Sequence, residues 1–192
     1  LTDAYLETGT LTETQIHSGL RQGVNQRAFV PVLFGAALRN LGVQPILDAV
    51  IDWMPSPLDR PAIAAHDLQG KELRCLPDPK HPVVALVFKI FHEKYGDLHY
   101  LRIYSGTLKE RQRLLVARTG RVERVGRILR MHAEHREQLP SAGPGAIVAV
   151  AGLKFAQTGD TLCLKGDEVL LESIAFPEAV MKLTVEPSEP GE

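Results

Sequence analysis

The sequence predicts a mainly β fold, in which a closed antiparallel β-barrel is preceded by a small α/β piece. The first observation is a succession of short segments rich in β-branched and aromatic residues, separated by glycine-containing turns, which is typical of a barrel. The second is a helix–strand–helix pattern in the first 57 residues, and the third is a proline-rich stretch between the two regions. The strand-like segments are Val83–Phe91, Leu98–Tyr104, Arg113–Ala117, Val122–His132, Ile147–Ala151, Thr161–Leu164, Val169–Ile174 and Met181–Val185.

The N-terminal piece, residues 1–57, combines two predicted helices with one predicted strand. A threonine followed three residues later by a glutamine has the pattern of a capping box, so we expect a helix over residues 13–23. Residues 28–35 form a short apolar run closed by glycine, as expected for a buried strand of a parallel sheet. Apolar residues at intervals of three and four then predict an amphipathic helix over residues 43–54.

Residues 58–82 are expected to be an extended linker, because they contain several prolines and few apolar clusters. A domain boundary is therefore predicted between the N-terminal piece and the barrel, to which we assign residues 83–187. The last residues, 188–192, read as a linker to a further domain.

Composition limits the classes of function. Lys and Arg number 22 against 23 Asp and Glu, giving a formal net charge of −1, so bulk charge does not make the chain a binder of polyanions. The two cysteines suit a reducing compartment better than a disulfide framework, and we expect a cytoplasmic protein. No apolar run approaches the ~20 residues needed to cross a bilayer, so a membrane is not an expected partner. DNA is not an expected partner either. We expect a monomer or a weak oligomer.

The basic residues are concentrated between residues 102 and 136. Arginine binds phosphates through a planar fork of donors, so a group of arginines on one face of a barrel would suit RNA. The candidates that flank the turn at Gly120 are Arg118, Arg121 and Arg124. The alternative is a solvated surface, and because side chains alternate along a strand, not all arginines of this block can line one patch.

We predict no catalytic residues and no metal site. The pair His132 and His135 lacks the spacing of a zinc-binding helix and has no adjacent third ligand. Cys163 has no neighbouring His and Asp or Glu to activate it, and is expected to be a small buried residue. The sequence also lacks the Gly-x-x-x-x-Gly-Lys-Ser/Thr pattern of a phosphate-binding loop.

Several motifs resemble those of translational GTPases of the elongation factor G type. The run Gly159-Asp160-Thr161-Leu162-Cys163, read with Tyr104–Leu108 and Gly126–His132, is similar to the second domain of that family. Residues 35–57 resemble the end of its GTP-binding domain. The similarity extends from Leu1 to about Pro187, and it implies a barrel of the translation-factor domain II type.

The resemblance also implies a function and a cofactor. It places Ala36, Ala37 and Leu38 in the loop that contacts guanine, with Ala36 where the family has serine. The parent protein would bind GTP and Mg, hydrolyse GTP and promote translocation on the ribosome, with the barrel contacting small-subunit ribosomal RNA. Without a phosphate loop, the chain is expected to be an excised fragment that is inactive by itself and holds no cofactor.

Three other interpretations remain open. A ribosomal protection protein of the tetracycline-resistance type and a class II release factor are both similar in this domain. A stand-alone barrel that binds RNA or protein without nucleotide is the third.

Among the departures from the family, Glu110-Arg111-Gln112 stands where the family has Ser-Gly-Asp, so a tight turn has lost its glycine and a divergent paralogue is expected.

Overall fold

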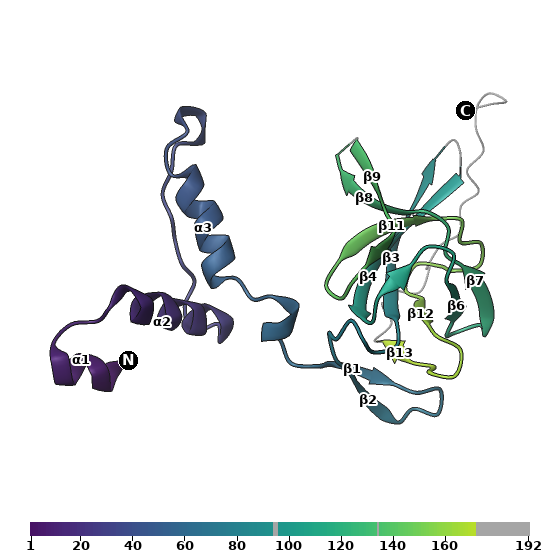
Figure 1. Cartoon of the computed structure of the whole chain (residues 1–192), viewed down its shortest axis with the longest axis horizontal. Coiled ribbons are helices and arrows are strands. Elements are labelled where there is room, and N and C mark those ends of the chain that lie inside the picture. Colours follow the sequence, from purple (N-terminus) through teal and green to yellow (C-terminus); the bar gives the residue numbers. More distant parts are fainter. Residues whose placement is uncertain (94–95, 134, 172–192) are drawn as a thin grey trace, which may run out of the picture.

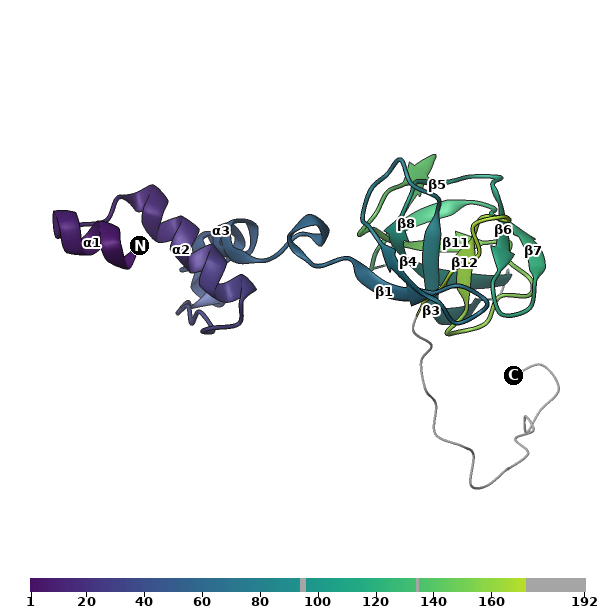
Figure 2. The ribbon, with the colours of Figure 1, turned by 90° about the horizontal axis from the view of Figure 1, so that it is seen from below.

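The computed structural model describes residues 1–93, 96–133 and 135–171. Its N-terminal part is helical and extends away from the β-sheets that form the rest of the described chain (Figures 1 and 2). It contains helices α1 (Thr2–Thr8), α2 (Glu13–Asn25) and α3 (Val43–Trp53), with short 3₁₀ turns at Ala37–Arg39 and Pro57–Asp59.

Helix α2 confirms the capping-box prediction. The Thr12 hydroxyl accepts a hydrogen bond from Gln15 N, while the Gln15 side chain accepts one from Thr12 N at 2.9 Å. The helix continues two residues beyond the predicted end at residue 23, and α3 begins at the predicted residue and ends one residue early. Helix α1, which has no buried residue, was not predicted.

The predicted strand over residues 28–35 is wrong for this structure. These residues form no strand, and their apolar side chains are exposed, with Val30 at 84% and Phe34 at 89% of full exposure. The only pairing nearby is an isolated antiparallel bridge between Ala36 and Leu41. A parallel strand is stable when both faces are covered and both neighbours are present, and the described residues supply neither.

The remainder of the described chain is antiparallel β structure, in agreement with a mainly β fold. The largest sheet has eight strands in the order β7-β6-β12-β3-β4-β11-β8-β9. A second sheet has the order β13-β1-β2, and β10 pairs with β5. The strand bounds are β1 Ile63–His66, β2 Glu72–Cys75, β3 Val84–Glu93, β4 Gly96–Ser105, β5 Leu108–Lys109, β6 Arg113–Val116, β7 Arg121–Arg124, β8 Ile128–His132, β9 His135–Leu139, β10 Ser141–Ala142, β11 Ile147–Ala151, β12 Thr161–Cys163 and β13 Leu170–Leu171.

The eight-stranded sheet is strongly curved (Figure 2), and its strands supply most of the main hydrophobic core. Successive side chains along these strands point to opposite faces, and on the other face Leu129 and Ala149 belong to one smaller buried cluster and Leu115 and Cys163 to another. The fully buried residues include Val87, Leu101, Ile103, Val116, Ile128, Val150 and Leu162.

The segment expected to be an extended linker contains two strands. Strands β1 and β2 form a hairpin, and β1 also pairs with β13 through Ala65 opposite Leu171. Ala65, Cys75, Val84 and Leu171 then form a small core of their own. The prolines flank this hairpin rather than interrupt it, so a high proline content did not exclude strands here.

Other strand boundaries also differ from the prediction. The single strand expected over residues 122–132 is two strands, because the chain bends at Gly126, where a Cβ atom would lie 2.2 Å from the Ala151 carbonyl oxygen. Strands β5, β9 and β10 were not predicted. The predicted strand over residues 169–174 is described only as β13, and the one over residues 181–185 lies outside the described residues.

Candidate functional site

The hairpin of β6 and β7 carries the three predicted RNA-binding arginines in or beside its turn. Hairpin pairing sets Arg113 opposite Arg124 and Val116 opposite Arg121. Arg121 and Arg124 are three residues apart, so they point to opposite faces of β7. The structure therefore does not bring the three predicted arginines together into one patch.

Arg118 is bound to a buried carboxylate. Its Nε donates to Asp160 Oδ1 at 2.6 Å, and its Nη2 donates to Asp160 Oδ2 and to Gln157 Oε1, both at 3.1 Å. Asp160 is only 3% exposed, and this bond raises the pKa of the Arg118 guanidinium. Two donors of Arg118 are thus engaged in holding the start of β12 to the hairpin turn.

Arg121 lies against an aromatic side chain. Its guanidinium carbon is 4.7 Å from the centre of the Phe155 ring, within the range of a cation–π interaction. Phe155 is 43% exposed and belongs to a loop that is held in place by Glu123, two residues after Arg121 in β7. The buried carboxylate of Glu123 accepts hydrogen bonds from the backbone N–H groups of Lys154, Phe155 and Ala156.

The same loop is held from a second side by a buried histidine. His99 Nε2 lies 3.2 Å from the Ala156 carbonyl oxygen, and burial lowers the pKa of its imidazole. His99 is therefore neutral at pH 7, with Nε2 as the donor. Its Nδ1 is buried and has no hydrogen-bond partner among the described residues.

Arg124 belongs to a different group, together with Arg111 and Arg113. The three line one hollow of about 470 Å³ on the outer side of the β6–β7 hairpin, with Val122 beside them. Of these three arginines, only Arg124 was predicted from the sequence. The register of the hairpin is the signal that could have found Arg113, because two strands joined through the turn at Gly120 must pair these residues.

The loop that resembles the guanine-binding loop is short and tightly closed. Ala36 and Leu41 exchange two backbone hydrogen bonds, at 2.9 and 3.2 Å, and the Ala37–Arg39 turn lies between them. Gly42 has a positive φ of 75°, and a Cβ atom there would lie 2.6 Å from the Phe34 carbonyl oxygen. Within the described part of the chain, the N–H groups of Ala37 and Leu38 have no acceptor.

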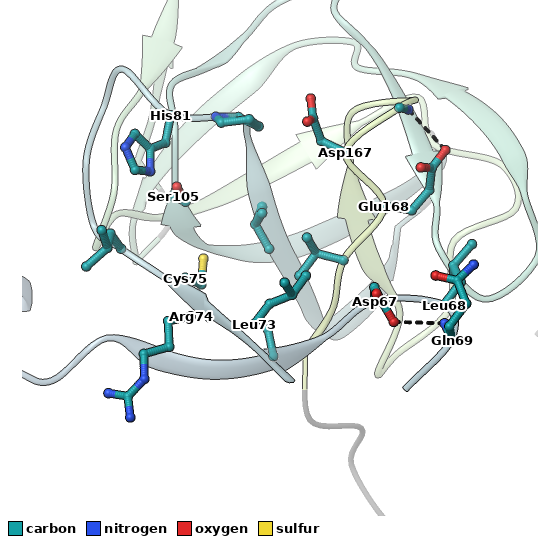
Figure 3. A pocket seen from close by; sticks show the side chains of 16 residues that line it. Asp67, Leu68, Gln69, Leu73, Arg74, Cys75, His81, Ser105, Asp167 and Glu168 are labelled. Atoms are coloured by element: carbon teal, nitrogen blue, oxygen red, sulfur yellow. Dashed lines mark hydrogen bonds between the residues drawn. The ribbon is translucent and has the colours of Figure 1, made fainter. Parts of the chain in front are cut away.

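A pocket of about 470 Å³ lies beside the β1–β2 hairpin, next to β13 (Figure 3). The Asp67 carboxylate accepts from the backbone of its own turn, at Gln69 N and Lys71 N, and Glu168 accepts from Gly166 N. Arg74 points away from the other labelled side chains (Figure 3). Burial raises the pKa of the Cys75 thiol, which disfavours the nucleophilic thiolate. These groups stabilise turns and do not form a catalytic arrangement.

The sequence also drew attention to His132, His135 and Cys163. His132 and His135 face each other across β8 and β9, and both are exposed. Cys163 is fully buried, as predicted. In residues 1–93, 96–133 and 135–171, no three His, Cys, Asp or Glu side chains are grouped to hold a metal ion. Over the same residues, no helix has the length and apolar character needed to cross a membrane.

Comparison with known proteins identifies the class of the β part. Residues 96–163, which include the β6–β7 hairpin and most of the main hydrophobic core, match the family model for elongation factor Tu domain 2. The chain is also similar to elongation factor G of Neorickettsia sennetsu (strain ATCC VR-367 / Miyayama), with 44% identity over 191 residues. That alignment covers 99% of this chain and 28% of the relative. The chain is thus similar to a fragment of an elongation factor G-like translational GTPase, and it spans little more than a quarter of the length of this relative.

Proposed function

We propose that the chain is the part of an elongation factor G-like translational GTPase that joins the end of its GTP-binding domain to a ribosome-contacting β domain. The observation that carries this proposal is the 44% identity to elongation factor G along 99% of the chain. The activity of the whole protein would be GTP-dependent movement of tRNA and mRNA on the ribosome.

The exposed apolar surface of the N-terminal part supports its assignment to a larger domain. Besides Val30 and Phe34, the side chains of Val32, Leu47 and Ile51 are all more than half exposed. A soluble protein rarely exposes this many neighbouring apolar side chains. We infer that the remainder of a GTP-binding domain covers them, and that residues 1–57 form its C-terminal end.

The guanine-loop assignment is part of the same proposal. The unpaired N–H groups of Ala37 and Leu38 would donate to the guanine carbonyl oxygen, a contact that requires no side chain. Ala36 would occupy the supporting position of the family's serine without its hydroxyl. GTP and Mg would be bound by the whole protein, because this chain has no phosphate loop.

We further infer that the eight-stranded sheet closes into a barrel. Beyond β7, Val125 N and O hydrogen-bond to Gln112 O and Arg111 N, each at 2.9 Å. Gly126 N then donates to Ala151 O at the end of β11, at 3.1 Å. The Val125 bonds extend the β6–β7 hairpin, and the Gly126 bond connects this edge of the sheet to β11 near its other edge, as closure requires.

The proposed domain limits are 1–57 for the end of the GTP-binding domain, 83–187 for the β domain, and 188–192 for a linker. Residues 58–82 connect the two domains, with β1 and β2 folded against β13. We place the protein in the cytoplasm, where ribosomes are available to it.

Small-subunit ribosomal RNA is the proposed partner of the β domain, and the β6–β7 hairpin is the proposed contact region. Arg118, Arg121 and Arg124 project from or beside its turn. Of these, Arg124 retains all its donors within the described structure, whereas Arg118 is engaged by Asp160.

Ribosome-stimulated GTP hydrolysis tests the proposal. We expect the full-length protein that contains this segment to hydrolyse GTP faster when ribosomes are added. Isothermal titration of the 192-residue chain with GTP should show no saturable binding, because the phosphate loop is absent. Hydrolysis that ribosomes do not stimulate would refute the translational role, and micromolar GTP binding by the chain would refute the assigned domain content.

A further inference from the structure

Three arginines converge on the outer side of the β6–β7 hairpin, in the hollow lined by Arg111, Arg113 and Arg124. Arg113 and Arg124 are directly opposite each other across the two strands, so their side chains leave the sheet on the same face. Arg111 lies in the turn that precedes β6. We refer to these three residues as the arginine triad.

The triad has no internal source of charge compensation. Within residues 1–93, 96–133 and 135–171, none of the three guanidinium groups forms a salt bridge or a side-chain hydrogen bond. The nearest carboxylate in the hollow is that of Glu123, which lies on the opposite face of β7 and accepts the three N–H groups of residues 154–156. Like charges directly opposite each other on adjacent strands are destabilising.

The backbone holds Arg111 in place at a further cost. Its φ is 62°, in the left-handed region that a residue with a Cβ atom rarely adopts. The conformation is fixed by the hydrogen bond from Arg111 N to Val125 O at 2.9 Å, and by the bond from Lys109 N to Gln112 Oε1 at 3.0 Å. Strained residues cluster at ligand-binding sites, and here the strain coincides with an unpaired group of like charges.

We propose that the arginine triad is a binding site for the phosphodiester backbone of RNA. Each guanidinium offers a planar fork of donors that fits two oxygens of a phosphate, and three such groups in one hollow can contact successive phosphates. Val122 of β7, which is 41% exposed, gives the hollow an apolar wall against which a ribose can pack. The inference rests on the proposed ribosomal function and names the residues that would make the RNA contact.

Salt-dependent RNA binding by the 192-residue chain tests the triad. The probe is a fluorescently labelled RNA hairpin, and its Kd is measured across a series of KCl concentrations. We expect the double variant R113Q/R124Q to bind more weakly and to lower the slope of log K against log salt by about 1.5, because each lost phosphate contact lowers it by ~0.7–0.9. The control R74Q/R130Q removes the same charge from exposed arginines elsewhere and should keep the slope of the unmodified chain.

Thermal unfolding separates binding from a structural role. R124E places an acid opposite Arg113, so we expect an unfolding midpoint at least as high as that of the unmodified chain together with a loss of RNA binding. If the triad were structural, R113Q/R124Q and R124E would both unfold at lower temperature, and that result would overturn the proposal.

Four further outcomes bear on the triad and on the proposed function. An unmodified chain that does not bind the hairpin at the lowest salt overturns the triad as an RNA site, as does a slope that R113Q/R124Q leaves unchanged. Tighter binding of a poly-glutamate peptide than of RNA would assign the triad to an acidic protein instead. Failure of the full-length protein to bind ribosomes would refute the proposed function while leaving the measured RNA slopes to judge the triad.

Discussion

Glu123 and His99 are buried polar residues that fix one loop from two sides, although neither stands out in the sequence. Glu123 accepts the N–H groups of residues 154–156, and His99 lies within hydrogen-bonding distance of the Ala156 carbonyl. Phe155 and Lys154 are thereby held at the surface next to Arg121. At the residue scale, the loop is ordered mainly by these buried hydrogen bonds.

The substitution E123Q should destabilise the protein. One amide N–H₂ would replace a carboxylate oxygen and face backbone donors, so we expect the free energy of unfolding to fall by ~1–3 kcal/mol. Urea unfolding measures the change. The control E137Q alters an exposed glutamate paired with Arg130, and it should have little effect. Equal stability of E123Q and the unmodified chain would show that the carboxylate is not needed to order the loop.

His99 should make stability depend on pH. Burial lowers the pKa of its imidazole in the folded state, whereas in the unfolded chain the pKa is near the ordinary value of about 6.5. Below that pH the unfolded state binds a proton that the folded state does not, so stability is retained above about 6.5 and falls as the pH decreases. Urea midpoints measured from pH 7.5 downward should show this loss, and H99Q should reduce it. An identical pH profile in H99Q would assign the loss to other groups.

Arg111 offers a direct test of backbone strain, because its φ of 62° suits glycine. The substitution R111G should raise the free energy of unfolding by ~0.5–1 kcal/mol. Relief of the left-handed conformation stabilises the folded state, and the greater entropy of glycine in the unfolded chain offsets part of that gain. R111A is the matched control, since it removes the same charge but keeps the strain. Thermal unfolding of both variants separates the two effects, and no gain of R111G over R111A would contradict the strain.

At the scale of elements, the β1–β2 hairpin determines where a protease should cut the chain. Because β1 pairs with β13, the accessible connection lies between Pro57 and Ile63. Limited proteolysis should first remove the N-terminal helices, because the exposed apolar residues of that part lack a covering domain. The remaining fragment should begin near residue 60. Mass spectrometry identifies the cut. Equal protection of the whole chain would contradict two separate units.

The strands that the sequence predicted best are short apolar segments bounded by turns. Strands β4, β6 and β11 lie within two residues of their predicted limits, because their apolar residues are concentrated in short runs that turn residues close. Residues 28–35 failed, since an apolar run specifies a strand only where neighbouring strands are present. The short strands β5 and β10 depend on each other over two residue pairs, and no local pattern announces them.

The candidate site was predicted only in part. Composition located the basic region, but the choice among its arginines depended on pairing. Asp160, which engages Arg118, lies directly before β12 and 42 residues away, so the sequence alone could not show that Arg118 is bound. The register of the hairpin could have identified Arg113 as a neighbour of Arg124. It could not have identified Arg111, which lies in the turn before β6 and has a positive φ.

At the scale of the whole molecule, the chain joins two parts with different surfaces. The helical part exposes apolar side chains that call for a covering domain, and the β part has its own buried core and a basic hairpin. A GTPase that acts on the ribosome needs such a connection, because a change at the nucleotide must reach the surface that contacts RNA. The proposed protein would use residues 58–82 as that connection.

Codon-by-codon movement of mRNA on the ribosome is the measurement that tests the central claim most directly. The full-length protein is mixed with ribosomes that carry tRNA in the position before translocation, and a fluorophore at the mRNA end reports movement. We expect rapid movement by one codon with GTP and much slower movement with GDP. Absence of movement with GTP would contradict it, and release of tetracycline or of a finished peptide in its place would identify the protection-protein or release-factor alternative.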